Sequence, residues 1–215
     1  MKASTFPAWP RGFPLEHIKE SASYNYEIKD LLLRNVTSRD IAIVQSVANH
    51  DPDVDAIYRF TQPLPFKFMA SSKVLVSLST NSYTPFNAQA TLFYRDAFWM
   101  LLLPVTVHGR VSDIWRSLIA QRLARETGQR ILFSGPWVEQ IRNSHDYIKD
   151  FAAEEHLYYR SRILVEVLNK LEFSFDSLMG RMEETWVELY NRGFLEYEDV
   201  ELLQLWIADL MIFGY

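Results

Sequence analysis

Residues 112–133 read SDIWRSLIAQRLARETGQRILF, and this stretch decides the fold class. Its apolar residues recur at the spacing of one face of an α-helix. They are Ile114, Trp115, Leu118, Ile119 and Leu123. Ser112 can cap such a helix, and Gly128 stands where a C-terminal glycine belongs. The apolar run 130–133 follows directly, so the sequence predicts a helix and then a strand.

The segments before this stretch favour strands. Two β-compatible runs, 41–47 and 54–60, are separated by the turn-forming residues 49–53. Residues 73–78 (KVLVSL) alternate well enough to predict a further strand. Three of the nine prolines lie in residues 1–20, which we therefore expect to form a loop.

The segments after this stretch favour helices. Residues 152–171 are periodic, residues 176–190 predict a second helix, and a third begins near Asp199, whose carboxylate can cap it. Strands come first and helices follow, with a helix-to-strand alternation between them. This order predicts a mixed α/β domain that carries a helical C-terminal tail.

The composition excludes several classes of protein. In 215 residues, 48% are apolar and 23% charged, which is unlike a disordered, fibrous or membrane-spanning chain. The net charge of −5 argues against nucleic acid as a partner. Without cysteine, disulfides, zinc-thiolate sites and thiol catalysis are excluded. Common nucleotide-loop, hydrolase and zincin motifs are also absent.

Neither a secretory leader nor a membrane anchor is predicted. The first 18 residues contain no continuous apolar core of the length that a leader needs. The most apolar window, 97–107, has a proline inside it and is well short of the roughly twenty residues that span a bilayer.

An acidic run lies at residues 49–55 (NHDPDVD). Its carboxylates, Asp51, Asp53 and Asp55, occupy alternate positions and would share one side of an extended chain. Such a set could hold a hard divalent cation such as Mg²⁺ or Mn²⁺. An Asp-Pro turn with solvated carboxylates explains the same pattern, and the spacing alone favours the turn.

Asp113 falls in the first turn of the best-defined helix, beside Trp115 and Arg116. The helix dipole stabilises a carboxylate at this position, which needs no further purpose. The same carboxylate beside an aromatic ring can orient a hydroxyl or act as a general base. Trp115 could stack on a sugar ring, although its helical spacing favours the core. The residues alone leave both interpretations of Asp113 open.

Residues 142–147 (RNSHDY) are dense in hydrogen-bonding groups. They follow a predicted strand, where open α/β sheets usually place their sites. His145 beside Asp146 could be a metal ligand or a proton carrier. A lone histidine in a loop is more often only solvated or hydrogen-bonded.

Four longer segments bring these candidates together. They are WPRGFPL (9–15), QSVANHDPDVDAIYRFT (45–61), PFNAQATLFYRDAFWMLLLPVTVHGRVSDIWRSLIAQRL (85–123) and IRNSHDYIKDFAAEEHLY (141–158). In this order they resemble the STELLO family of glycosyltransferase-like proteins, and the resemblance covers residues 9–171. Members of that family are Golgi type II membrane proteins with a domain similar to GT-A glycosyltransferases, and plant members assist cellulose synthase assembly.

The resemblance implies a partial GT-A-like mixed sheet with flanking helices, and it implies roles for particular residues. VSDIW (111–115) is similar to the acidic helix start that GT-A enzymes use near the acceptor, which makes Asp113 the catalytic candidate. His145 resembles the late histidine that completes the site of a divalent metal, Mn or Mg. Substrate-binding roles are implied for neighbouring residues: Asn87, Gln89, Arg110, Trp115, Arg116, Arg142 and Asn143.

The chain also departs from the family pattern. The family places its nucleotide-binding half, with the D-x-D motif for the metal, before the segment that resembles residues 9–15, and this chain begins almost at that segment. The acidic run 49–55 matches a later family segment, so it is not that motif. Where the family has Asn-Ser-Gln, residues 87–89 read Asn-Ala-Gln and lack one hydroxyl.

We therefore expect residues 1–171 to form a glycosyltransferase-like domain without its donor half, and residues 172–215 to form a helical extension. The expected activity is transfer of a sugar from a nucleotide sugar to a sugar acceptor once a donor half is supplied, so this chain alone is expected to be inactive. The alternative is a non-catalytic interaction or assembly module that binds a protein partner. The resemblance also implies a Golgi location.

Overall fold

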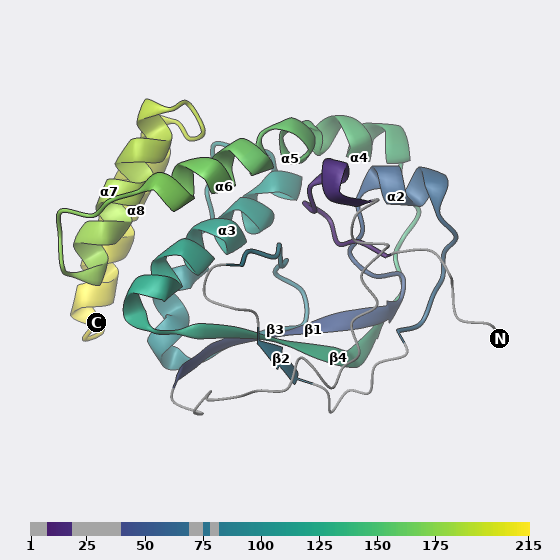
Figure 1. Ribbon diagram of the computed structural model, residues 1–215, viewed down its shortest axis with the longest axis horizontal. Coiled ribbons are helices and arrows are strands. Elements are labelled where there is room, and N and C mark those ends of the chain that lie inside the picture. Colours follow the sequence, from purple (N-terminus) through teal and green to yellow (C-terminus); the bar gives the residue numbers. More distant parts are fainter. Residues whose placement is uncertain (1–7, 19–39, 69–74, 78–81) are drawn as a thin grey trace.

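The computed structural model describes residues 8–18, 40–68, 75–77 and 82–215 (Figure 1). Its sheet has four strands in the order β2-β4-β1-β3. β1 (Ile41–His50) and β4 (Arg130–Gln140) lie in the centre and run parallel, whereas β3 (Thr91–Phe93) and β2 (Leu75–Ser77) pair antiparallel at the edges. The expected mixed α/β class is confirmed, and this sheet with its flanking helices is consistent with a partial GT-A-like fold.

Helix α3 (Gly109–Thr127) packs on the sheet and contributes more buried residues to the central core than any other described element. Its N-cap lies four residues before the expected Ser112, because the His108 side chain accepts a hydrogen bond from the backbone N–H of Arg110. Asp113 is therefore the fifth residue of the helix and not in its first turn, contrary to prediction. Gly128 ends the helix with a φ of 70°, as predicted. The strand that follows is β4, so the helix-to-strand order is confirmed.

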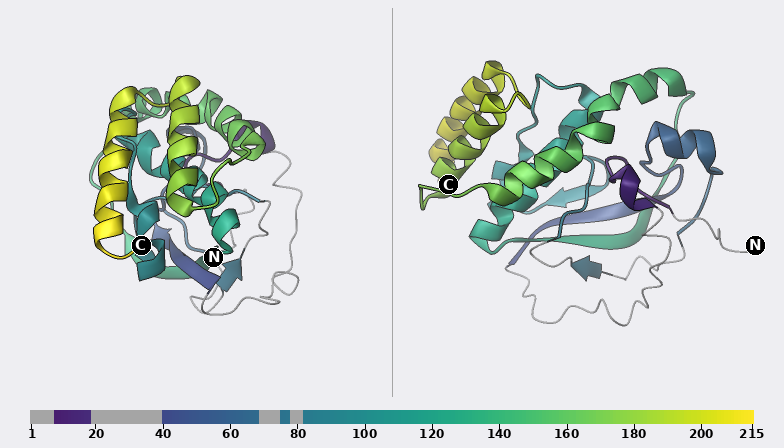
Figure 2. Two further views of the ribbon diagram at one scale, coloured as in Figure 1. Left: turned by 90° about the vertical axis from the view of Figure 1, so that its left-hand side faces the viewer. Right: turned by 45° about the horizontal axis from the view of Figure 1, so that its top comes forward.

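Further helices form a layer on the far side of α3 from the sheet, as Figures 1 and 2 show. They are α4 (Tyr147–Ala153), α5 (Glu155–Tyr159) and α6 (Ser161–Lys170). The sequence predicted a single helix over 152–171. The helix is interrupted at Glu154 and again at Arg160, and the buried carboxylate of Glu154 accepts a hydrogen bond from the backbone N–H of Ala56 at 2.8 Å.

The C-terminal tail is a pair of helices, α7 (Leu178–Asn191) and α8 (Tyr197–Ile212), at one end of the molecule (Figure 1). Their apolar faces join the same core as α3. Asp199 does not cap α8, contrary to prediction. Its buried carboxylate accepts hydrogen bonds from the backbone N–H groups of Val105 and Thr106. The tail is therefore tied to the loop before α3.

The predicted strand over 54–60 is wrong, because this segment forms helix α2 (Ala56–Thr61). The side chain of Asp55 accepts a hydrogen bond from the backbone N–H of Tyr58 at 2.7 Å and so caps the helix. This cap overrides the β preference of the β-branched and aromatic residues nearby.

Short elements complete the described fold. They are the 3-10 helices η1 (Leu15–His17) and η4 (Arg95–Leu101). β2 confirms a strand within the predicted run 73–78, whose other residues lie outside the described part of the chain, as do residues 1–7 and 19–20 of the predicted N-terminal loop. Among the helices that the structure describes, none is both long and apolar enough to cross a bilayer.

Candidate functional site

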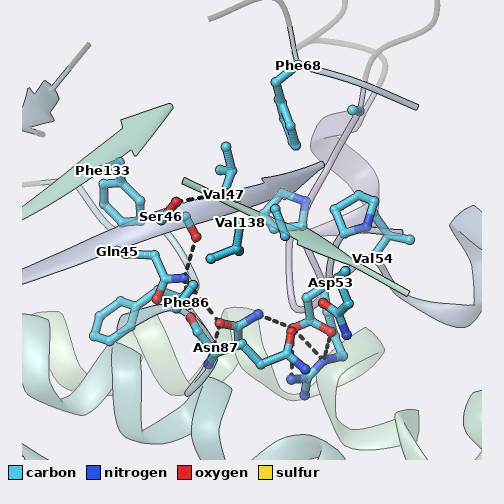
Figure 3. A pocket seen from close by; sticks show the side chains of 18 of the residues that line it. Gln45, Ser46, Val47, Asp53, Val54, Phe68, Phe86, Asn87, Phe133 and Val138 are labelled. Atoms are coloured by element: carbon cyan, nitrogen blue, oxygen red, sulfur yellow. Dashed lines mark hydrogen bonds and ion pairs between the residues drawn. The ribbon is translucent and has the colours of Figure 1, made fainter. Parts of the chain in front are cut away.

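A cavity of about 530 Å³ lies between the sheet and the N-terminal end of α3 (Figure 3). One wall comes from the carboxyl-terminal parts of β1 and β4, and the opposite wall comes from residues 84–90 and the N-terminal segment 8–11. Open α/β sheets bind ligands beyond the carboxyl ends of their parallel strands. The position of the cavity therefore makes it the candidate site.

Arg11 is the centre of a buried ion network beside this cavity. Its Nη2 donates to Asp53 Oδ2 and to Asp113 Oδ2, each at 2.9 Å, and its Nη1 donates to Asp113 Oδ1 at 3.0 Å. Nε donates to both oxygens of Asp53, and Nη1 also donates to the backbone carbonyl of Arg110. Every donor of the guanidinium is used. The attraction of the two carboxylates raises the pKa of Arg11 even though burial alone lowers it.

Asp53 receives hydrogen bonds from three side chains. Besides Arg11, Arg142 donates to its Oδ1 at 3.0 Å and the Asn87 amide donates to its Oδ2 at 2.9 Å. Burial alone would raise the pKa of Asp53, but the charge and hydrogen bonds of Arg11, with help from Asn87 and Arg142, lower it overall. Asp53 is thus held as an ionised anchor.

The acidic run does not form a three-carboxylate site, contrary to the cation-site interpretation, because Asp51 and Asp53 share Arg142 while Asp55 caps α2. Asp51 pairs with Arg59 at 2.7 Å, Asp53 binds Arg11 and Arg142, and Asp55 caps α2. Each of the first two is neutralised by arginine. Within the described residues, no three histidine, aspartate or glutamate side chains group as metal ligands do.

Asp113 lies beside the cavity, which its neighbour Ile114 and its partner Arg11 line, and its side chain is 14% exposed. Its Oδ1 accepts hydrogen bonds from Arg11 and from its neighbour's backbone N–H at Ile114. Its Oδ2 accepts one from Arg11 and a long one, at 3.3 Å, from the backbone N–H of Ala88. The carboxylate is therefore fixed in orientation and already well supplied with donors.

Asn87 and Gln89 lie in the cavity wall, and their substrate-binding role stays a prediction. Figure 3 shows Gln45 and Asn87 joined in a chain that ends at Asp53. Gln45 also donates to the backbone carbonyls of Ser46 and Gln89. The amide groups thus bind one another and set the shape of the loop.

Two expected substrate-binding residues are enclosed in the core. Trp115 is 0% exposed and its Nε1 donates to Ser161, so it has no free face for a sugar. Arg116 is 3% exposed and lies over the rings of Phe86 and Phe93. Burial lowers the pKa of Arg116 to about 10, partly offset by Asp113. The prediction that Trp115 and Arg116 bind substrate is therefore corrected, because both side chains pack in the core.

Arg110 and His145 belong to a second cluster, around Asp150 of α4. Arg110 forms ion pairs with Asp150 and with Glu154. His145 lies 3.5 Å from the same Asp150 carboxylate, and Asn143 is exposed nearby in the chain. His145 is therefore not brought together with Asp113 in the Arg11 network. With Asp150 engaged by Arg110, this histidine offers a metal at most one ready ligand.

Comparisons with known proteins agree with the sequence pattern. A family model described as "STELLO glycosyltransferases" matches residues 110–215, which include Asp113 and the helical tail. The Arabidopsis thaliana protein named "Probable glycosyltransferase STELLO2" is 31% identical over 216 residues, which is 96% of this chain and 26% of that protein. "Probable glycosyltransferase STELLO1" of the same plant is 28% identical over 212 residues, which again is 96% of this chain and 26% of that protein.

The chain belongs to the STELLO family. This STELLO chain spans about a quarter of the length of the two curated relatives. The expected resemblance is confirmed.

Sequence reasoning missed the N-terminal part of the STELLO site. Trp9 donates from Nε1 to Asp55 at 2.8 Å, and Gly12, with a φ of 83°, leaves space for Ile114. Burial raises the pKa of Asp55 to about 6, opposed by the hydrogen bonds from Tyr58 and Trp9. The motif WPRGFPL carried the signal, but only contacts across the fold show that it builds one side of the cavity.

Proposed function

We propose that this chain forms the acceptor side of a glycosyltransferase, which transfers a sugar from a nucleotide sugar to an acceptor. One observation carries the proposal: Arg11 lines a cavity beyond parallel strands and fixes Asp113 beside it, in a chain of a family described as glycosyltransferases. The names of the two relatives support the same reaction class.

The role assigned to Asp113 is to orient a hydroxyl of the acceptor. Arg11 holds the carboxylate from one side and fixes its plane. The 3.3 Å hydrogen bond from the Ala88 N–H is the longest that Asp113 accepts, so an acceptor hydroxyl displaces it at least cost. A hydroxyl bound to Oδ2 in this way becomes more nucleophilic as its proton is drawn toward the carboxylate.

The nucleotide sugar and a divalent metal, Mn²⁺ or Mg²⁺, are assigned to a donor half outside this set of residues. The arginine partners of Asp51 and Asp53 leave these carboxylates unfit for a metal. This chain supplies the metal with at most one ligand, His145. A GT-A class for the complete enzyme and a Golgi location belong to the same proposal and rest on the family resemblance.

A second function is favoured by the saturation of the network. Both oxygens of Asp113 already accept hydrogen bonds, and Asp53 is fully engaged by donors. A carboxylate whose oxygens all accept hydrogen bonds within the protein can serve a purely structural role. The second candidate is therefore a non-catalytic module that keeps the glycosyltransferase shape and binds a protein partner.

The test is a transfer assay on the intact natural protein that contains this chain. A panel of nucleotide sugars is supplied with Mn²⁺ and oligosaccharide or glycolipid acceptors, and the product is detected by mass spectrometry. The proposal predicts a glycosylated acceptor with at least one donor. Absence of product from every donor would overturn the first function, and binding of a protein partner without turnover of any nucleotide sugar would favour the second.

A further inference from the structure

The enclosed polar groups of the cavity are already hydrogen-bonded to one another. The amide of Gln45 donates to Asn87 and to two backbone carbonyls, and its carbonyl accepts from Thr91. The Asn87 amide donates to Asp53, and the other side chains that donate to Asp53 are Arg11 and Arg142. A site built to bind a polar ligand keeps groups for it, because unpaired buried groups are what discriminate such ligands. Here those groups are used up internally.

The Ser46 hydroxyl completes this pattern. It donates to the carbonyl of Val47 at 2.8 Å and accepts from the backbone N–H of Trp137 at 2.9 Å. Three other polar residues, Gln89, Glu139 and Gln140, lie at the more open edge. The deep part of the cavity therefore offers a ligand few free hydrogen-bonding groups among the described side chains.

Apolar side chains make up the rest of the wall. Aromatic rings line it on several sides, from Trp9, Phe66, Phe68, Phe86 and Phe133. Alkyl groups fill the gaps between them, from Val47, Val54, Ile114 and Val138. Roomy cavities with apolar walls bind apolar ligands.

The apolar surface continues outward from the cavity. Val138 and Ile141 line the cavity and are 42% and 84% exposed, respectively. At the same end of the molecule, α2 and α4 expose Phe60 and Ile148, and Phe60 meets Tyr147 edge to face (Figure 1). An exposed apolar rim that leads into an apolar cavity is typical of a site for a long apolar chain rather than for a compact ring.

We infer that the cavity binds the hydrocarbon chain of an amphipathic lipid, and that the acceptor of the proposed transfer is a glycolipid. This inference rests on the proposed function for the identity of the head group. The hydrocarbon tail of the lipid enters past Val138 and Ile141, and its sugar head group stays at the polar edge near Asp113. No charged partner is needed for the tail, since it is held by burial alone.

The test compares probes that share one sugar. Calorimetry measures binding of maltose, phenyl maltoside and dodecyl maltoside below its micelle concentration to the purified chain. Dodecyl maltoside should bind at least tenfold more tightly than the other two, because several methylene groups are buried. Equal affinity for maltose and dodecyl maltoside, or a preference for the phenyl glycoside, would overturn the inference.

Matched variants show where the tail binds. Val138→Asp places a charge on the rim and should weaken dodecyl maltoside binding at least tenfold. Ile141→Asp, at a more exposed position that the fold tolerates easily, should weaken it in the same direction. The control Leu205→Asp changes an equally apolar, 66% exposed residue of α8 and should leave the affinity unchanged. Equal weakening by the control would show non-specific detergent binding and would overturn the inference.

These measurements need no sugar transfer. Loss of the tail preference therefore contradicts the lipid inference and leaves the transfer proposal standing. A tail preference in a protein without transferase activity supports lipid binding by the cavity and contradicts the transfer proposal.

Discussion

The guanidinium of Arg11 donates two hydrogen bonds to the carboxylate of Asp113, which lies 102 positions away in the sequence. The Nη1–Oδ1 and Nη2–Oδ2 distances are 3.0 and 2.9 Å. The same guanidinium binds Asp53. One residue of the N-terminal segment thus joins the start of α3 to the loop after β1. Arg11 and Asp53 also line the cavity, so this contact lies directly beside it.

Removal of the central cation should be costly. Arg11→Met leaves two mostly buried carboxylates without their shared partner, and we expect it to lower the free energy of unfolding by about 3–5 kcal/mol. The control Arg162→Met removes an exposed arginine of α6 and should cost less than about 1 kcal/mol. Urea unfolding measures both. Similar losses for the two variants would show that the network does not stabilise the fold.

Gly12 allows the N-terminal segment to approach α3. An added Cβ would lie 2.4 Å from Ile114 Cγ2, and φ is +83°. Gly12→Ala therefore combines a steric clash with backbone strain, and it should cost more than about 2 kcal/mol. Gly128→Ala has similar strain, with φ +70°, but open space, and it should cost about 1–2 kcal/mol. Equal thermal shifts in the two variants would contradict the close approach.

Asp55 should make stability depend on pH. Its folded pKa of about 6 lies above the ordinary 3.8, so its contribution is fully present below about pH 4 and is lost as the pH rises through 6. The unfolding free energy of the natural chain relative to Asp55→Asn should therefore fall by about 2–3 kcal/mol between pH 4 and 7.

The control for this titration is Asp53→Asn. The pKa of Asp53 is lowered, so its stabilisation is present above the ordinary value and is lost only as the pH falls below it. The relative stability of this variant should stay level from pH 5 to 7. A fall with rising pH in both comparisons would rule out Asp55 as the source.

His145 should contribute little to metal binding by this chain. Calorimetric titration with Mn²⁺ should show only weak binding, because one imidazole without free carboxylates beside it is too small a ligand set. His145→Ala should leave the titration nearly unchanged. Micromolar binding that disappears in this variant would contradict the assignment of the metal to a donor half.

The sequence predicted those parts of the fold that local signals determine. The apolar periodicity of α3, its terminal Gly128 and the following run of β4 lie within one short stretch, so they could be found without any contact across the fold. The segment 54–60 could not, because the cap at Asp55 is reinforced by Trp9, which lies 46 positions away. Local β preference pointed to the wrong structure there.

The site was only partly predictable for the same reason. Asp113, Asn87 and Gln89 were found from their motifs, and the structure places them at or beside the cavity. The side-chain direction of Trp115 and Arg116 depends on what packs against α3, which no spacing reveals. Arg11 was missed because its charge has meaning only beside Asp53 and Asp113.

The most direct measurement is the transfer rate of the intact natural protein with Asp113→Asn. The substitution keeps the shape of the side chain but removes one of the two carboxylate charges that face buried Arg11, so the stability loss should exceed the roughly 1 kcal/mol of an exposed ion pair. The assay is therefore run well below the melting temperature of the variant, beside the exposed control Asp209→Asn. We predict that Asp113→Asn lowers kcat on the order of a hundredfold and that Asp209→Asn does not change it. An unchanged kcat in folded Asp113→Asn would contradict the assignment of this carboxylate to the acceptor.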